Sequence, residues 1–439
     1  MKRVLSMFLC LILLAGLICG CGNSSTSSDD TPKTSDEQAS KEKETDTPST
    51  DAEPVTISIL QSQPEYTDAY NAYISEYKKV APNVTIDLQV LQTDYPTVLK
   101  SRIAAGSIPD IFMTTAGGEL KAYAEYSADL SNEPLASAMS ESVKKDMTYD
   151  GKLMGVPLVM DSFPLIYNKK LFAEAGITEL PKTLAELEEV CKQLESKGIT
   201  PFANGYKEWW VQKHIFQHFI VGASSDPAKL VNDFIAGNTK FADHPILLNY
   251  FDFIDLTVKY GDSKPLESDF NAQVGTFANG QAAMITGQGQ WIESSVTKID
   301  PDFDFGVMLY PVSDDPNQAN VCAGSAQCLR VYKDSKVLAE AKNLLNWLYT
   351  SDYGKKWFGE VAKVISPVKD ATAPDMKIPT AFAELTKITP SSGAPVNYSL
   401  DSFHQKFGEI IQAYIGGAKT RDQAVEEIQN AWVKLGAAN

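Results

Sequence analysis

The sequence predicts an α/β protein whose folded body divides into two lobes. Segments with the alternating apolar pattern of strands take turns along the chain with segments of helical spacing. This order is typical of sheets whose strands are connected by right-handed helical crossovers. The chain has 439 residues, and residues 55–439 exceed what one hydrophobic core usually organises, which favours two lobes.

Residues 1–20 have the pattern of a lipoprotein signal peptide. A basic start is followed by an uncharged apolar stretch over residues 4–18, which is shorter than the roughly 20 residues that a membrane-spanning helix needs. Residues 18–21 (Ile-Cys-Gly-Cys) resemble a bacterial lipobox and predict lipidation of Cys21. The alternative is ordinary signal cleavage that leaves a free thiol at Cys21.

Residues 21–54 are expected to form the lipidated cysteine and a disordered linker. After Cys21 the segment is rich in Ser, Thr and acidic residues and holds no aromatic or large aliphatic side chain, so it cannot bury enough surface to offset its chain entropy. A flexible coil of this length reaches roughly 30 Å. We therefore expect an exported protein, tethered to the outer face of the bacterial cytoplasmic membrane.

The body opens with elements that alternate in type. Apolar and polar residues alternate over 55–59 and over 84–90, as expected for strands, and residues 97–105 have the apolar spacing of a helix. A further strand is expected within 107–113. The helix between the first two strands carries four apolar residues on one face: Tyr70, Tyr73, Ile74 and Tyr77.

Two later helices carry start signals. Thr183 with Glu186 forms a capping box, and Gly198 is expected to close that helix. Thr420 with Gln423 forms a second box. The helix after it has a core face at helical spacing: Ala424, Val425, Ile428, Ala431, Trp432 and Leu435.

Charge and cysteine content exclude some classes of protein. The chain carries 39 basic and 56 acidic residues, a net charge of −17, which argues against a nucleic-acid partner. Six cysteines do not make a disulfide framework at this length. Cys322 and Cys328 could pair after export, with Cys191 left over, or all three could be buried free thiols.

Motifs for catalysis and for metal binding do not emerge from the sequence. It holds no phosphate-binding loop, dinucleotide fingerprint, HExxH or GxSxG pattern. His214 and His218 share a helix face, but only His244 and His404 remain as further histidine ligands, so two polar helix residues are favoured over a zinc site.

The acidic residues suggest neither a calcium site nor a catalytic pair of carboxylates. The alternating residues 300–305 resemble a calcium loop only in part, because no glutamate closes it, and a strand is favoured. A glycosidase needs two carboxylates held about 5–10 Å apart, and nothing in the sequence singles out such a pair. We expect no catalytic residue, no metal and no cofactor, and an exported carbohydrate-active enzyme stays an alternative.

Aromatic residues in loops before helices are the positive signal. Trp209 and Trp210 follow Tyr206 in a loop containing Asn and Gly, and Trp291 follows the Gly-rich residues 287–290. Aromatic faces stack on the apolar faces of sugar rings, while amides and carboxylates bind the hydroxyls. For Trp210, a position in the core of a lobe is an equal alternative.

Several motifs together resemble the family 1 extracellular solute-binding proteins, the carbohydrate-capturing lipoproteins of bacterial ABC importers. Residues 155–157 (Gly-Val-Pro) and 167–177 (Tyr-Asn-Lys-Lys-Leu-Phe, then Ala-Gly-Ile) match the first signature. Residues 181–187 continue it, residues 277–291 resemble the family's "FxxGxAAM…GxW" element, and 416–428 resemble its terminal helix. The resemblance covers the whole body.

The resemblance implies a periplasmic-binding-protein-like fold of class II, with the ligand cleft between two lobes joined by several hinge crossings. The first lobe is expected over 55–160 and 312–366, and the second over 161–311 and 367–439. The crossings would then lie near 159–164, 310–312 and 366–367.

Ligand-binding residues were assigned by their position in this fold and by the aromatic signal. Some follow the first-lobe strands, some lie at the first crossing, and the others lie in loops of the second lobe. For Tyr398 and His404, a place on the surface or in the core is the favoured alternative. The candidates are Gln63, Tyr66, Glu119, Asp161, Phe163, Tyr206, Trp209, Trp210, Gln288, Trp291, Tyr398 and His404.

The expected function is that of a monomeric, membrane-tethered, non-enzymatic receptor. It would capture a sugar, with an oligosaccharide favoured, and deliver it to the permease subunits of an ABC importer and their ATPase. The same fold binding an amino acid, a peptide or another small solute is the main alternative. An amino-acid ligand would be favoured by an arginine in the cleft that binds its carboxylate. Arg102, Arg330 and Arg421 are expected outside the candidate site, which argues against such a ligand.

Overall fold

The computed structural model describes residues 53–325, 327–393 and 399–437. The predicted signal peptide (1–20), the predicted lipidation site Cys21, nearly all of the linker predicted over 21–54, and Tyr398 lie outside these ranges. Among the described residues, no helix is long and apolar enough to cross a membrane.

The first of two four-stranded sheets has the strand order β12-β3-β1-β2. Its strands are β1 (Val55–Gln61), β2 (Val84–Val90), β3 (Ile111–Thr115) and β12 (Gln327–Val331). β1 pairs in parallel with β2 and β3, and β12 runs antiparallel to β3. The strands expected over 84–90 and within 107–113 are thus present, the second shifted two residues onward.

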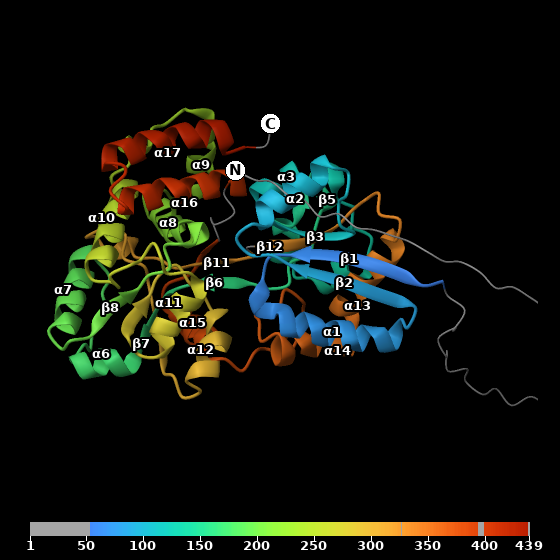
Figure 1. Ribbon diagram of the computed structural model, residues 1–439, viewed down its shortest axis with the longest axis horizontal. Coiled ribbons are helices and arrows are strands. Elements are labelled where there is room, and N and C mark those ends of the chain that lie inside the picture. The colour runs from blue at the N-terminus through green and yellow to red at the C-terminus, as the bar shows by residue number, and fades with distance from the viewer. Residues whose placement is uncertain (1–52, 326, 394–398, 438–439) are drawn as a thin grey trace, which may run out of the picture. The chain divides into compact units, whose positions relative to one another are not determined.

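Helices cover both faces of this sheet. They are α1 (Thr67–Val80), α2 (Tyr95–Ala104), α3 (Gly118–Ala122), α4 (Pro134–Ala138), α5 (Glu141–Asp146), α13 (Leu338–Thr350) and α14 (Asp352–Lys356). Figure 1 shows α1, α13 and α14 on one side of the sheet and α2 and α3 on the other. The lobe also contains the hairpin β4 (Thr148–Tyr149) and β5 (Lys152–Leu153), the 3₁₀ turns Pro64–Tyr66 and Ala124–Tyr126, and a π-helical turn, Trp357–Val361.

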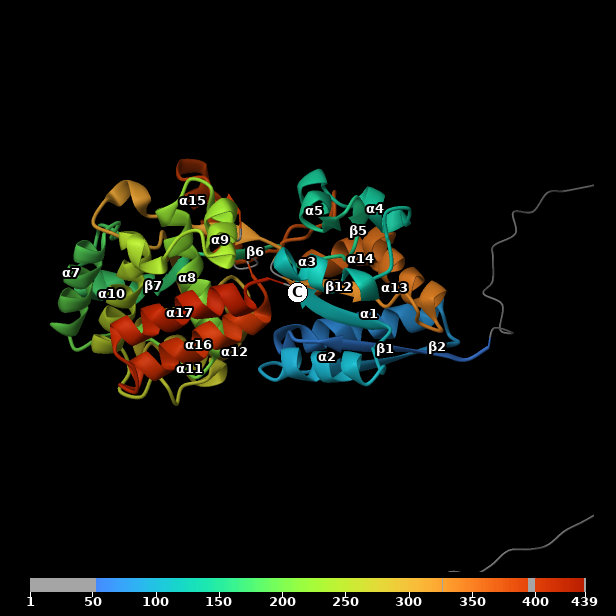
Figure 2. The ribbon, with the colours of Figure 1, turned by 90° about the horizontal axis from the view of Figure 1, so that it is seen from above.

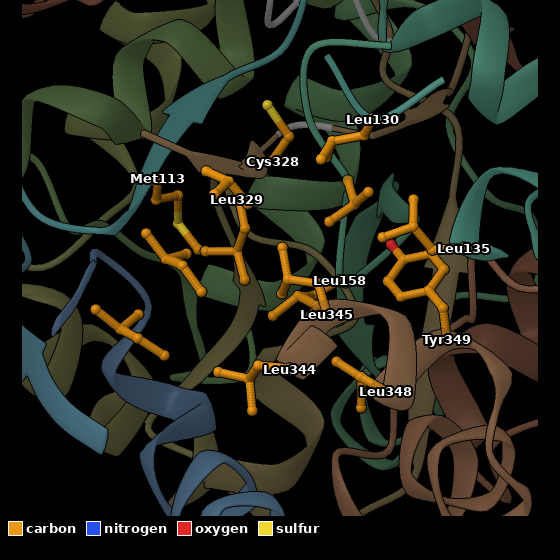
Figure 3. Packing of buried hydrophobic residues seen from close by; sticks show 14 of the residues in the cluster. Met113, Leu130, Leu135, Leu158, Cys328, Leu329, Leu344, Leu345, Leu348 and Tyr349 are labelled. Atoms are coloured by element: carbon orange, nitrogen blue, oxygen red, sulfur yellow. The ribbon is translucent and has the colours of Figure 1, made fainter. Parts of the chain in front are cut away.

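Apolar side chains from sheet and helices form the first core. Figure 3 shows Met113 of β3 and Leu329 of β12 beside Leu344, Leu345 and Leu348 of α13. These side chains are almost completely buried. The buried cluster takes its members from residues 57–159 and 328–368, and we call this part of the chain the first lobe.

The second sheet has the order β10-β7-β9-β8. Its strands are β7 (Leu165–Asn168), β8 (Thr200–Ala203), β9 (Ala282–Ile285) and β10 (Phe305–Met308). β7 runs antiparallel to both neighbours, and β8 is parallel to β9. The strand expected over 300–305 begins only at Phe305, because the Asp302 amide binds the Asp300 carboxylate at 3.1 Å in a turn.

Ten helices of the described chain surround this sheet, and with it they form the second lobe. They are α6 (Lys169–Ala175), α7 (Leu184–Glu195), α8 (Trp209–Ala223), α9 (Pro227–Ala236), α10 (Pro245–Lys259), α11 (Phe270–Ala278), α12 (Ile292–Ile299), α15 (Lys377–Ile388), α16 (Asp401–Ile415) and α17 (Arg421–Leu435). Figures 1 and 2 show α16 and α17 side by side. Both predicted capping boxes, at Thr183 and Thr420, are present.

Short strands connect the two lobes. β6 (Asp161–Phe163) pairs antiparallel with β11 (Cys322–Gly324), which also pairs with β13 (Ser392–Gly393). β6 lies within the first crossing expected at 159–164. Apolar residues on either side of it belong to different clusters, since Val159 packs in the first lobe and Leu165 in the second.

The other two crossings lie later than expected. Val312 packs in the second lobe beside Tyr310, whose ring stacks on His218 with centroids 3.9 Å apart. The chain rejoins the first lobe only after β11. Val368 still packs in the first lobe, and Ile378 is the next residue buried in the second. Residue 312 therefore belongs to the second lobe and residue 368 to the first, so both crossings lie further along the chain than expected.

Candidate functional site

A pocket between the two lobes collects most of the aromatic residues that the sequence singled out. It holds about 760 Å³ of space, part of it open to solvent. Its first-lobe lining consists of Ser62, Gln63, Glu65, Gln92, Tyr95, Pro96 and Gln327. From the second lobe come Trp209, Trp210, Lys213, His214, Phe270, Trp291 and Asp401, and β6 contributes Asp161 and Phe163.

The first-lobe lining follows the ends of two parallel strands. Ser62, Gln63 and Glu65 come directly after β1, and Tyr95 begins α2 shortly after β2. Parallel strands present their carboxyl ends at one edge of a sheet, which is where α/β proteins bind ligands. The Tyr95 hydroxyl accepts the Met113 amide proton at 2.7 Å, which fastens the start of α2 to β3.

Helix α8 supplies four lining residues from its first two turns. Trp209 and Lys213, and likewise Trp210 and His214, are four residues apart and therefore lie one above the other on the helix. Helix α16 approaches α8 so closely here that a Cβ on Gly408 would lie 2.7 Å from the Trp209 Cβ. A larger residue at position 408 would push the α8 aromatic face out of place.

The indole groups of the two α8 tryptophans differ from that of Trp291 in their hydrogen bonding. The indole N–H groups of Trp209 and Trp210 are buried and have no hydrogen-bond partner within the described chain. The Lys213 ammonium lies 5.2 Å from the Trp209 ring centroid and 3.2 Å from Asp401 Oδ1. Burial of such an N–H group without a partner costs free energy.

Trp291 is held in the pocket by its neighbours. Its indole N–H donates to Gln288 Oε1 at 3.0 Å, and its ring meets Phe163 edge-on with centroids 5.6 Å apart. Any side chain at Gly289 would collide with the Trp291 ring, since a Cβ there would lie 2.2 Å from it. The glycine at position 289 of the Gly-rich turn therefore leaves the space that the Trp291 ring occupies.

The crossing strand β6 is fixed by Gln290. Its Oε1 accepts the amide and hydroxyl protons of Ser162 at 2.7 and 2.9 Å, and its Nε2 donates to Asp161 Oδ1 at 3.2 Å. Asp161 is 5% exposed and Gln290 is fully buried. The Asp161 carboxylate thus stands at a defined place at the junction of the lobes.

Burial shifts the ionisation of several pocket groups. Removal from water raises the pKa of Glu65 to about 7, and the negative charge of Asp161 adds to this rise. Burial also opposes ionisation of Asp401, but Lys213 and His404 outweigh it and hold the pKa of Asp401 below its ordinary value. Burial and the charge of Lys213 lower the pKa of His214, so its ring is neutral. Its Nδ1 therefore donates to the Gly287 carbonyl at 3.0 Å.

The structure brings six of the proposed ligand-binding residues together in this pocket: Gln63, Asp161, Phe163, Trp209, Trp210 and Trp291. Five others do not line it. Tyr206 is fully buried and bonds Thr257 at 2.6 Å, and Gln288 supports Trp291 from behind. Tyr66 packs in the first core, and Glu119 and His404 lie behind Asp401.

Other lining residues were missed. Lys213 and His214 follow the two tryptophans by one helical turn, so the spacing could have identified them once Trp209 and Trp210 were chosen. Glu65 lies two residues after a predicted one. No local signal marks Asp401, which reaches the pocket from the start of α16.

Neither a metal cluster nor a disulfide occurs in the described part of the chain. No group of three His, Cys, Asp or Glu residues converges there. Cys322 and Cys328 do not pair, and both thiols are buried and free, as is that of Cys191. His218, paired with His214 in the zinc alternative, instead binds Asn320 at 3.1 Å in the interior.

A second hollow lies on residues of both lobes and β11, with about 1700 Å³ of space that includes open solvent. It is lined largely by small residues, such as Gly117, Ser224, Ala228 and Gly324, and none of the described residues of its lining is aromatic. The first pocket, which has both aromatic faces and carboxylates, is the better candidate for the functional site.

Comparison with known proteins establishes the class. The family model of the bacterial extracellular solute-binding proteins matches residues 63–355, so the chain belongs to this family. Members of the family are binding proteins and not enzymes, which removes the enzymatic alternative.

Individual relatives are distant. The chain is 23% identical over 313 residues to the multiple sugar-binding protein of Streptococcus mutans, covering 69% of this chain and 73% of that one. It is 23% identical over 361 residues to the melibiose/raffinose/stachyose-binding protein MelE of Bacillus subtilis, covering 79% and 77%. A solved chitin oligosaccharide binding protein is similar in fold, with a TM-score of 0.77, 22% identity and coverage of 87% and 99%.

Proposed function

We propose that this protein captures a saccharide outside the cytoplasm, preferably an oligosaccharide, and delivers it to the permease subunits of an ABC importer. The observation that carries the proposal is the pocket itself, where tryptophans from one lobe face carboxylate and amide groups from the other lobe and from β6. The names of the two relatives, which describe sugar binding, support the same conclusion. The ligand-binding residues proposed are the pocket residues rather than Tyr206, Gln288 or His404.

Binding would work by closure of the lobes around the ligand. A ligand that contacts both lobes stabilises the closed arrangement of the lobes relative to the open one. The size of this stabilisation is the difference between the ligand's binding free energies for the two arrangements. Polar contacts between described residues already join the lobes. The Thr93 hydroxyl donates to Glu208 at 2.9 Å, and the Asp401 amide donates to Glu119 at 3.4 Å.

Calorimetric titration of the purified full-length protein tests this proposal. The ligands are melibiose, raffinose, stachyose, maltotriose, diacetylchitobiose and xylotriose, with amino acids and peptides alongside. Saturable binding of one saccharide class, with the sugar recovered intact, is the expected result. Binding of an amino acid or a peptide, with no heat from any saccharide, would contradict it.

Trp291→Ala is expected to weaken saccharide binding by about 1–3 kcal/mol, a range taken from aromatic rings stacked on nucleic-acid bases. Removing the indole takes away a ring face in the pocket. Titration measures the loss, and Trp347→Ala is the matched control, because Trp347 is a half-buried tryptophan of the first lobe that stacks on Tyr73 outside the pocket. Equal affinities of the two folded variants would remove Trp291 from the site.

We also propose that the protein is anchored to the membrane through a lipid on Cys21. Cys21→Ser should abolish incorporation of a labelled fatty acid into the protein, because the lipid is attached to the cysteine sulfur. Cys19→Ser, two residues away in the same segment, is the control and should keep the label. Labelling of the Cys21→Ser protein at the level of the control would refute the anchor.

A further inference from the structure

The pocket carries more acidic than basic side chains. Its lining contains the carboxyl groups of Glu65, Asp161 and Asp401 and one lysine, Lys213. The Lys213 ammonium lies 3.2 Å from Asp401 Oδ1. The Lys213 ammonium is thus already paired with the carboxylate of Asp401.

The other two carboxyl groups of the lining, those of Glu65 and Asp161, come from the first lobe and from β6. Glu65 lies in the 3₁₀ turn after β1, and Asp161 begins β6. Their charges repel, since Asp161 adds to the rise that burial gives the pKa of Glu65. The influences on this pKa are burial, a hydrogen bond from the backbone amide of Glu65 itself, and Asp161, and none of them is a cation.

His214 does not compensate for this charge. Burial and Lys213 hold its pKa well below the ordinary value, so the ring stays neutral at physiological pH. Its Nδ1 is engaged by the Gly287 carbonyl at 3.0 Å. A negatively charged ligand would therefore enter a pocket whose lining already holds like charges, and such juxtaposition is costly.

We propose that the pocket selects saccharides without negative charge and rejects acidic saccharides such as uronates, with Glu65 as the specificity-determining residue. This inference rests on the proposed saccharide-binding function. Hydroxyl groups of a neutral sugar donate hydrogen bonds to the Glu65 and Asp161 carboxylates. A uronate places a carboxylate, which has only acceptor oxygens and a negative charge, against the same groups.

The test compares one saccharide in two charge states. The neutral saccharide that binds most tightly in the titrations is oxidised at its primary alcohol to the uronate, and both forms are titrated at pH 8, where Glu65 is ionised. Wild-type protein should bind the uronate at least about tenfold more weakly than the neutral form. Glu65→Gln should narrow that ratio several-fold, chiefly by improving the affinity for the uronate.

Glu125→Gln is the matched control, because Glu125 is an exposed glutamate of the first lobe outside the pocket. It should leave the ratio of affinities unchanged. A wild-type protein that binds the uronate as tightly as the neutral form, or a Glu65→Gln protein with the wild-type ratio, overturns the inference while saccharide binding stands. Failure of every saccharide, neutral or acidic, to bind overturns the proposed function and this inference with it.

Discussion

Replacing Arg330 with methionine is expected to lower the free energy of unfolding by about 3–5 kcal/mol. Arg330 lies on β12 with its side chain fully buried. Its guanidinium donates to Thr114 Oγ1 at 2.7 Å, to Ser127 Oγ at 2.9 Å and to the Glu119 carbonyl at 3.0 Å. Each bond involves a charged donor inside the protein, and such bonds contribute about 1.5–3 kcal/mol.

The loss of the Arg330 hydrogen bonds should destabilise the first lobe as a whole. The residues bound by Arg330 come from β3, from the segment after Tyr126 and from α3, and one further bond reaches the Met154 carbonyl at 3.4 Å. Methionine fills part of the volume but donates no hydrogen bond, so these buried acceptors lose a partner.

Urea unfolding followed by tryptophan fluorescence measures the effect. Arg102→Met is the control, because Arg102 lies near the surface, where its guanidinium donates to the side chain of Gln89 on the same lobe. A change within about 1 kcal/mol is expected for it. Unfolding of the Arg330→Met protein at the urea midpoint of this control would show that the buried network contributes little.

Local sequence signals predicted the elements that depend on neighbouring residues. The capping boxes at Thr183 and Thr420 begin α7 and α17, since each box is completed within three residues. The alternation over 84–90 coincides with β2. The crossings after the first lie later than the resemblance implied, because the lobe that buries a segment is decided by residues far away in the sequence.

The site was predictable only in part, for a related reason. Trp209, Trp210 and Trp291 could be identified because each lies at the start of a helix, directly after a loop that contains glycine. Tyr206 belongs to the same loop as Trp209, and the choice of which ring faces the pocket depends on Thr257, which binds the Tyr206 hydroxyl. Such a contact joins residues far apart in sequence, and no pattern in a single sequence reveals it.

The other large effect expected is a pH dependence of stability that comes from Glu119. This residue of α3 is 5% exposed. Burial, and then the charge of Asp401, raise its pKa from 4.5 to about 7, although the Thr115 amide donates to its carboxylate at 2.9 Å. Because the pKa is higher in the folded than in the unfolded state, the stability that Glu119 contributes is fully present below about pH 4.5. It is lost as the pH rises through 7.

Glu119→Gln should remove this dependence, since glutamine is uncharged at every pH. A shift of this size corresponds to roughly 3 kcal/mol. The stability of the variant relative to wild type should therefore improve by up to about that amount between pH 5 and pH 8. The comparison must be made between variants, because His404 also titrates. Burial lowers its pKa to about 4, which reduces the stability of both proteins as the pH falls below 6.5.

Urea unfolding at the two pH values measures this difference, with Glu125→Gln as a control that should show none. The Arg330 guanidinium donates to the backbone carbonyl of Glu119 at 3.0 Å, but the rise in the pKa of the Glu119 carboxyl follows burial and the charge of Asp401. Asp401 repels the ionised form of Glu119, and Lys213, the cation of the pocket, is bound to Asp401 at 3.2 Å. A Glu119→Gln protein whose stability relative to wild type is the same at pH 5 and pH 8 would mean that Glu119 is already ionised in the folded protein. The contact between α3 of the first lobe and α16 of the second would then join two carboxylates that are both charged.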